Sequence, residues 1–287
     1  MKKLLLLLVC IPATFIAQID TEVFVFDIIK EGNDYQLKNG KNISNNSGYD
    51  SQPFFYENEK IIFASNRNGK TDIMFYNLKD NTKRFISNSF EGGEYSPQKR
   101  PNSKHISAVR LDNNGLQRFY SYNFKTGKDK EIIKDFKIAY PAWYNKNTLI
   151  AVTIVNESLE LLIFDLQNKT KTSVSKNVGR SVHKIPNSNL ASFISKENKE
   201  NWLVKSLNPK TKEIKIITPV GKSEDITWLP DGILLIANGK AIYKYNPKKD
   251  TSPNLFFHFS NENINNISRI AVNPDGTKIA LVAEVSP

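Results

Sequence analysis

Three acidic residues, Asp50, Glu94 and Asp225, stand at the starts of short predicted strands. Glycoside cleavage needs two or three carboxyl groups around one pocket, where they act as acid, base or nucleophile. A sugar-cleaving site therefore requires these three groups to approach within roughly 5 to 10 Å of one another. Acids at the ends of loops also form turns and caps. The three residues are thus candidates for catalysis, and the alternative is that they only form turns and caps.

Other reactive side chains do not form a recognisable set. The sequence contains no G-x-S-x-G motif, which excludes the serine hydrolases that carry this nucleophile turn. His105, His183 and His258 fall just before a second strand, on a first strand and on a last strand of the repeat described next. Histidines at unrelated repeat positions do not converge on one ion. We expect neither a metal nor a cofactor.

The elements that position these residues belong to an internal repeat. The stretch "IIFASNRNGKTDIMFYNL", Ile61 to Leu78, holds two apolar runs, and with its flanks "YDSQPFFYENEK" and "KDNTKRFIS" it makes four short strands. Equivalent first-strand positions are separated by 44, 44, 41, 44 and 44 residues. They are Pro53, Pro97, Pro141, Val182, Ile226 and Ile270. A period of this length predicts an array of similar supersecondary units.

The two ends of the chain complete one unit between them. The last copy, "SRIAVNPDGTKIALVAEVSP", reaches only its second strand, and "TEVFVFDIIKEGNDYQLK" near the start resembles the second half of a copy. Joining them in one sheet leaves no open edge. Continuous apolar runs such as "KIIFAS" and "GILLIA" indicate strands covered on both faces. We predict an all-β fold, a six-bladed β-propeller of four-stranded antiparallel blades whose closing blade is shared between N- and C-terminal strands.

One polar position per repeat is the best candidate for binding. The residues immediately before the aligned positions form a predicted ring at one mouth of the channel, and they include an Asp/Arg pair that we expect to lie opposed. They are Gln52, Ser96, Tyr140, Ser181, Asp225 and Arg269. Hydrogen-bonding groups that converge in a concave site suit a peptide or a sugar. Trp143 and Trp228, just inside their first strands, are expected to pack the core and to come near this pocket.

The repeat resembles a known family. The unit "PFFYENEKIIFASNRNGKTDI" and the turns "WLPDG" and "NPDG" are similar to the WD-like repeats of TolB-type six-bladed β-propellers. The resemblance covers residues 21 to 287 and implies the propeller fold. The functions that it implies are diverse: protein-docking platforms, lids on peptidases and scaffolds for sugar-cleaving sites. Arg67 in "SNRNG" is expected to anchor its turn to a neighbouring strand.

Composition and the first residues predict export. Residues 1 to 17 combine the basic start "MKK" with the short apolar run "LLLLLVCIPATFI", which is typical of a signal peptide, with cleavage between Ala17 and Gln18. The single cysteine, Cys10, lies in this segment, so the mature chain is expected to have no disulfide. We expect residues 18 to 287 to form one propeller domain, a monomer without a transmembrane segment, in the periplasm or secreted.

The charge of the chain narrows the class of partner. A net charge of +11 favours anionic partners. Lysines scattered through the turns argue against nucleic acid, which selects a basic stripe. We therefore predict a non-enzymatic module that docks an envelope protein or peptide segment, or an anionic cell-envelope glycan, at the channel mouth. The alternative is a carbohydrate-active hydrolase or lyase that uses the three acids.

Overall fold

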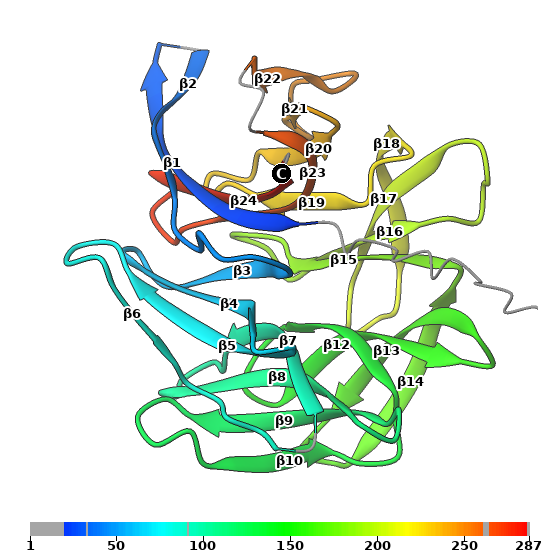
Figure 1. Ribbon diagram of the computed structural model, residues 1–287. Helices are drawn as coiled ribbons and strands as arrows, with labels where there is room; N and C mark the ends of the chain where they lie inside the picture. The colour runs from blue at the N-terminus through cyan, green and yellow to red at the C-terminus, as the bar shows by residue number, and fades with distance from the viewer. Residues whose placement is uncertain (1–19, 33, 91, 261–263, 286–287) are drawn as a thin grey trace, which may run out of the picture.

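The computed structural model describes residues 20–32, 34–90, 92–260 and 264–285. Within these ranges the chain forms 24 strands and no helix, arranged as six four-stranded sheets around one axis (Figure 1). The sequence-based prediction of a six-bladed propeller is confirmed. The predicted signal peptide, with Cys10 and the cleavage position, lies outside the described residues.

Each blade is an antiparallel sheet that runs outward from its first strand, and the blades are numbered by their order in the chain. Blade 1 consists of β3 Asp50–Glu57, β4 Lys60–Arg67, β5 Lys70–Asn77 and β6 Thr82–Phe85. Blade 2 consists of β7 Gly92–Lys99, β8 His105–Asp112, β9 Gln117–Asn123 and β10 Asp129–Ile133. Blade 3 consists of β11 Ile138–Trp143, β12 Thr148–Val155, β13 Ser158–Asp165 and β14 Thr170–Lys176.

The remaining blades follow the same order. Blade 4 consists of β15 Val178–Lys184, β16 Ala191–Ser195, β17 Trp202–Leu207 and β18 Ile214–Gly221. Blade 5 consists of β19 Asp225–Trp228, β20 Leu234–Asn238, β21 Ala241–Tyr245 and β22 Asn254–His258. Blade 6 consists of β23 Asn265–Val272 and β24 Lys278–Glu284 from the C-terminal part, with β1 Thr21–Glu31 and β2 Asp34–Asn42 from the N-terminal part.

Blade 6 closes the ring as the sequence predicts. β1 pairs antiparallel with β24, with Val23 opposite Val282, and the blue and red strands lie side by side in Figure 1. The first strand of each blade also contacts the first strand of the next, and β23 contacts β3 across the closure. Strands from the two parts of the chain therefore share one sheet, which removes two edges that would otherwise be exposed.

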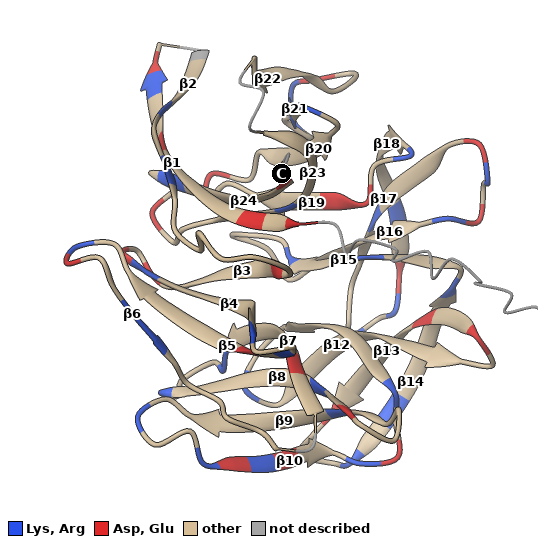
Figure 2. Ribbon diagram, viewed as in Figure 1, with Lys and Arg blue, Asp and Glu red and all other residues tan. Residues whose placement is uncertain are grey.

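Six apolar clusters lie between neighbouring blades and hold them together. The cluster between blades 6 and 1, for example, contains Val25, Ile61 and Val282, all at most 4% exposed. Middle strands contribute to the clusters on both of their faces, which explains why their sequences are continuous apolar runs rather than alternating ones. Charged residues occur mostly in the turns and outer strands, as the coloured ribbon of Figure 2 shows.

Candidate functional site

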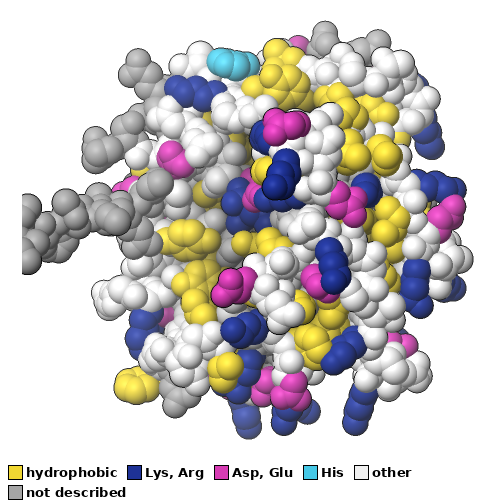
Figure 3. All heavy atoms as spheres, turned by 90° about the vertical axis from the view of Figure 1, so that its right-hand side faces the viewer, with side chains coloured by type: hydrophobic (Ala, Val, Ile, Leu, Met, Phe, Trp, Pro, Cys, Tyr) yellow, Lys and Arg dark blue, Asp and Glu magenta, His cyan; other side chains and the backbone are white. Residues whose placement is uncertain are grey.

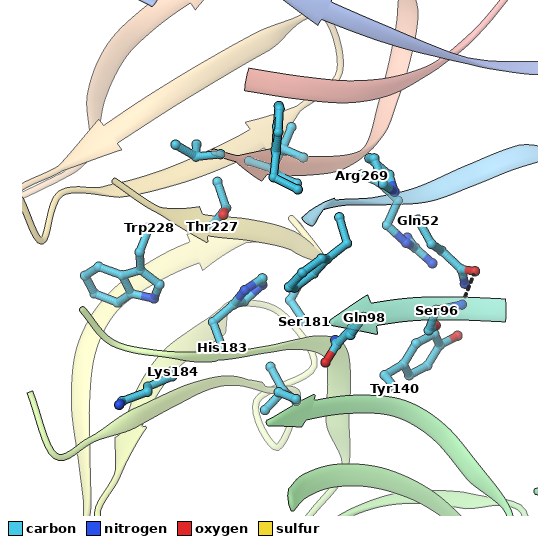
Figure 4. Close-up of a pocket in the computed structure, with 18 of the residues that line it drawn as sticks. Gln52, Ser96, Gln98, Tyr140, Ser181, His183, Lys184, Thr227, Trp228 and Arg269 are labelled. Atoms are coloured by element: carbon cyan, nitrogen blue, oxygen red, sulfur yellow. Dashed lines mark hydrogen bonds between the residues drawn. The ribbon is translucent and has the colours of Figure 1, made fainter. Parts of the chain in front are cut away.

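A central cavity of about 450 Å³ is lined by the first strands of all six blades. At one end its last layer is the predicted ring of polar residues. Towards the other end its lining continues to the turns between first and second strands, where it includes Pro101, Pro186 and Pro274. Figure 4 shows the side chains that point into it. A volume of this order is ordinary for a small-molecule or peptide-end site.

All six predicted ring residues line this cavity. They are Gln52, Ser96, Tyr140, Ser181, Asp225 and Arg269. Five of the six first strands have a register shift in the segment that holds the ring position. Bulges of this kind re-aim a side chain out of the regular sheet alternation. The strand geometry therefore directs these residues into one concave site. Their binding of a ligand stays a prediction.

Two ring residues adopt backbone conformations that cost free energy. Gln52 has φ 57° and Ser96 has φ 50°, and each directly precedes a proline. Left-handed φ is uncommon for residues other than glycine, and a following proline restricts the backbone further. The side-chain Oε1 of Gln52 accepts a hydrogen bond of 2.7 Å from the backbone N–H of Ser96, which ties blade 1 to blade 2. Strain of this type concentrates at sites where a side chain has to be held in place.

A group of ion pairs joins the neighbouring blades 4, 5 and 6 at the ring. Asp225, 5% exposed, accepts hydrogen bonds at Oδ1 from Nε of Arg180 at 3.2 Å and from Nη1 of Arg269 at 3.0 Å. Nη2 of Arg180 also donates to Asp225 Oδ2. Both arginines donate to the backbone carbonyl of Ser268, at 2.8 and 2.7 Å. The expected Asp/Arg pair exists, but Asp225 and Arg269 lie on neighbouring blades rather than opposed across the channel.

A second layer of side chains lies two residues further along each first strand. Its members in the cavity lining are Phe54, Gln98, Ala142, His183, Thr227 and Ala271. Burial lowers the pKa of His183 to about 4, so this imidazole is neutral at physiological pH. Neither this layer nor the role of Arg180 was predicted from the sequence. The two-residue alternation of strand side chains, counted from the ring, is the signal that would have found it.

The other two candidate acids do not line the cavity. Asp50 is 0% exposed, and its Oδ1 has no hydrogen-bond partner among the described residues. Burial, with a smaller contribution from the nearby Glu22 and Asp20, raises the pKa of Asp50 to about 7. The sequence-based expectation that acids at the first strands face the channel is therefore met by Asp225 but not by Asp50.

Glu94 is also 0% exposed and belongs to a buried hydrogen-bond network. Oγ of Ser87 lies 2.8 Å from Glu94 Oε2 and 2.9 Å from Asp72 Oδ1. One hydroxyl has one hydrogen, so both contacts can be hydrogen bonds only if one carboxyl group carries a proton. Asp72 is paired with Arg67 at 2.6 Å, which leaves Glu94 as the protonated group. Burial raises its pKa to about 7, in agreement with this assignment.

Arg67 has the structural role that the sequence suggests. Besides Asp72, its Nη2 donates to Asn88 Oδ1 at 2.8 Å, and its guanidinium lies 4.3 Å from the centre of the Phe85 ring. These contacts fix the turn between β4 and β5 to its own blade and to the segment that leads to blade 2. Arg67 is thus a turn anchor, as predicted.

Trp143 and Trp228 line the cavity and also join neighbouring blades. Trp228 Nε1 donates to Ser192 Oγ at 2.9 Å, and Trp143 makes the equivalent bond to Ser107 Oγ at 2.8 Å. We expect Trp228→Phe to lower the free energy of unfolding by about 1–3 kcal/mol, because the Ser192 hydroxyl, 0% exposed, loses its donor. Urea denaturation measures this change.

A second substitution tests the cause of that loss. Ser192→Ala in the Trp228→Phe background should recover most of the stability, because removing both partners of a buried hydrogen bond is nearly neutral. Trp202→Phe is the control, since no hydrogen bond of its Nε1 is present among the described residues. Equal losses for Trp202→Phe and Trp228→Phe would show that ring size, not the bond, sets the effect.

Neither a metal-binding cluster nor a membrane-spanning helix is present in the described part of the chain. No group of three or more His, Cys, Asp and Glu side chains in it is arranged to hold a metal ion. No helix there is long and apolar enough to cross a membrane. On the face drawn in Figure 3, basic and acidic side chains are interspersed rather than gathered into one basic patch.

Solved structures with the same architecture include two TolB-type proteins and a lyase, whereas no protein-family model and no curated sequence matches the chain. The TolB-type protein of Agrobacterium tumefaciens superposes with a TM-score of 0.73 at 11% identity, over 94% of this chain and 100% of that one. TolB of Acinetobacter baumannii gives 0.59 at 14% identity, over 92% of this chain and 64% of that one. Oligogalacturonate lyase of Vibrio parahaemolyticus gives 0.52 at 10%, over 93% and 98%. In its fold the chain is therefore a six-bladed β-propeller of the TolB type.

Proposed function

We propose that this protein is an exported, non-enzymatic binding module whose central cavity receives a segment of an envelope partner. The observation that carries the proposal is the cavity itself, to which every blade contributes one ring residue and which holds only one of the three candidate acids. Cavities with an apolar wall and a few converging polar groups are typical binding sites. The TolB-type structures support a docking role by analogy of fold only.

The charges and strain of the ring favour binding over catalysis. Asp225 accepts hydrogen bonds from two arginines, so its carboxylate oxygens are already engaged by cations. A general acid or base needs a carboxyl group that reaches the reacting atoms of a substrate. Gln52, which is held in a costly conformation, uses its Oε1 to hold the backbone of Ser96 rather than to supply a reactive group.

Photo-crosslinking in the cells that normally produce the protein tests the proposal. A photoreactive amino acid replaces either Lys184, at the cavity, or Lys215, on the outer strand β18. We expect a partner adduct from position 184 and not from position 215. Filling the cavity with Ala271→Trp, in a variant shown to fold by its thermal unfolding, should abolish the adduct. An adduct that survives Ala271→Trp would place the partner outside the cavity and overturn the proposal.

A carbohydrate-active enzyme remains the alternative function, and the likeness to oligogalacturonate lyase is the observation that favours it. It requires chemistry by Asp225 together with groups other than Asp50 and Glu94, because neither of those lines the cavity. Incubation with polygalacturonate decides between the two. Release of unsaturated or reducing ends that disappears in Asp225→Asn would support the enzyme and contradict the binding module.

A further inference from the structure

Arg269 offers unused hydrogen-bond donors at the ring end of the cavity. Its Nη1 serves Asp225 and the carbonyl of Ser268, but no acceptor among the described residues engages its Nε or Nη2. A guanidinium has five N–H groups in a planar fork. The guanidinium lies 5.9 Å from the centre of the aromatic ring of Tyr140. The Arg269 side chain therefore extends from blade 6 across the cavity towards blade 3. Its free edge is therefore available to a ligand.

Two further donors lie beside it. Gln52 uses its Oε1 to accept from Ser96, which fixes the orientation of its amide and leaves Nε2 without a protein acceptor among the described residues. The Tyr140 hydroxyl likewise has no hydrogen-bond partner in the described part of the chain. Figure 4 shows Arg269, Gln52, Ser96 and Tyr140 grouped on one side of the cavity. A group of hydrogen-bond donors that have no acceptor within the protein matches a ligand group that accepts hydrogen bonds.

The charge of the lining points to an anion. The cationic side chains that line the cavity outnumber the one anionic side chain, Asp225; they are Lys99, Arg180, Lys184 and Arg269. Glu224 and Glu57, outside the lining, pair with Arg180 and Lys99, so Lys184 and Arg269 carry most of the excess. A concave site focuses the electrostatic field of the charges that line it, which strengthens the preference for an anion. Arginine binds carboxylates in a planar, bidentate geometry, which is stronger and more selective than a single hydrogen bond.

The layer next to the ring favours a peptide end over a sugar. Phe54, Ala142 and Ala271 supply apolar surface directly beyond the donors. Trp228, which is 7% exposed and held by Ser192, offers little of the open aromatic face on which sugars commonly pack.

We propose that the cavity binds the C-terminal end of a peptide. Its terminal carboxylate accepts hydrogen bonds from Arg269, Gln52 and Tyr140, and its last side chain packs on the second layer. The proposal deepens the binding function above and rests on it. In this proposal Arg269 makes the protein prefer peptides with a free C-terminus to peptides whose C-terminus is blocked.

The test compares the same peptides with and without a terminal charge. An array of short peptides is probed with the mature protein, each peptide once with a free C-terminus and once amidated. The best binder is then titrated calorimetrically in both forms. We expect the free acid to bind the wild-type protein at least about tenfold more tightly. This preference should fall to within about twofold in Arg269→Gln and persist in Lys215→Gln, an exposed control on β18.

Each outcome separates the inference from the function on which it rests. Equal affinity of acid and amide, both lost in Ala271→Trp, would overturn the carboxylate assignment and leave the binding function standing. An array without binders, together with binding of a trigalacturonate probe that Arg269→Gln abolishes, would replace the peptide by an acidic sugar. Peptide binding that neither Ala271→Trp nor Arg269→Gln changes would contradict both proposals.

Discussion

Replacing Asp50 by Asn is expected to raise the free energy of unfolding by roughly 4 kcal/mol at pH 8 and to change it little at pH 4. Burial raises the pKa of Asp50 from 3.8 to about 7, and one pKa unit corresponds to about 1.4 kcal/mol. Between pH 4 and pH 7 the folded protein keeps a proton that the unfolded chain releases. Stability therefore falls as the pH rises through this interval and levels off above it.

The comparison of two pH profiles checks this prediction. Urea denaturation of the wild type and Asp50→Asn from pH 4 to pH 8.5 should give curves that diverge up to pH 7 and run parallel above it. Asp231→Asn, in the exposed turn of blade 5, is the matched control and should follow the wild type. Curves of the wild type and Asp50→Asn that stay parallel throughout would show that Asp50 does not carry the proton.

The position of Asp50 links its proton to closure of the ring. The backbone N–H of Asp50 bonds to Oγ1 of Thr21 at 3.3 Å, and Thr21 forms a bridge with Tyr49, so β1 of blade 6 meets the start of β3 here. Ionisation would place a negative charge beside the buried carboxyl group of Glu22, which is 6% exposed. We therefore expect the stability that is lost between pH 4 and pH 7 to be lost first at this junction.

The fold was predictable because its signals are periodic and redundant. Four-strand copies recur at nearly constant spacing, and the half-copies at the two ends can only complete each other in one sheet. Even the turn role of Arg67 followed from its place in the repeat. Each of these conclusions draws on several copies, so departures such as Val182 in place of a proline do not disturb it.

The site was predictable in position but not in detail. The repeat register located the ring residues, because one place per blade must face the axis. It could not show that Asp50 and Glu94 turn into the protein, since bulges next to the ring break the alternation that would fix their direction. Arg180 was missed for a related reason: it precedes Ser181 and reaches Asp225 of the next blade through a long side chain.

Removal of the Asp225 carboxylate is expected to lower the free energy of unfolding by roughly 2–4 kcal/mol in Asp225→Ala. Arg269 would then lose its carboxylate partner, while the neighbouring Arg180 would keep only Glu224, 3.2 Å from its Nε. The value lies below that of a fully buried pair because the two arginine side chains are 27% and 18% exposed. Thermal and urea unfolding at low salt measure the loss, which added salt should reduce.

A double-mutant cycle identifies the cause of that loss. If repulsion between the arginines dominates, Asp225→Ala combined with Arg269→Ala should be more stable than the sum of the two single changes predicts. Additive losses would contradict this explanation. The same substitution also separates the two functions, because Asp225 competes with a ligand carboxylate for Arg269. Asp225→Ala should therefore bind the free-acid peptide at least as tightly as the wild type, whereas an enzyme that uses Asp225 would lose its activity.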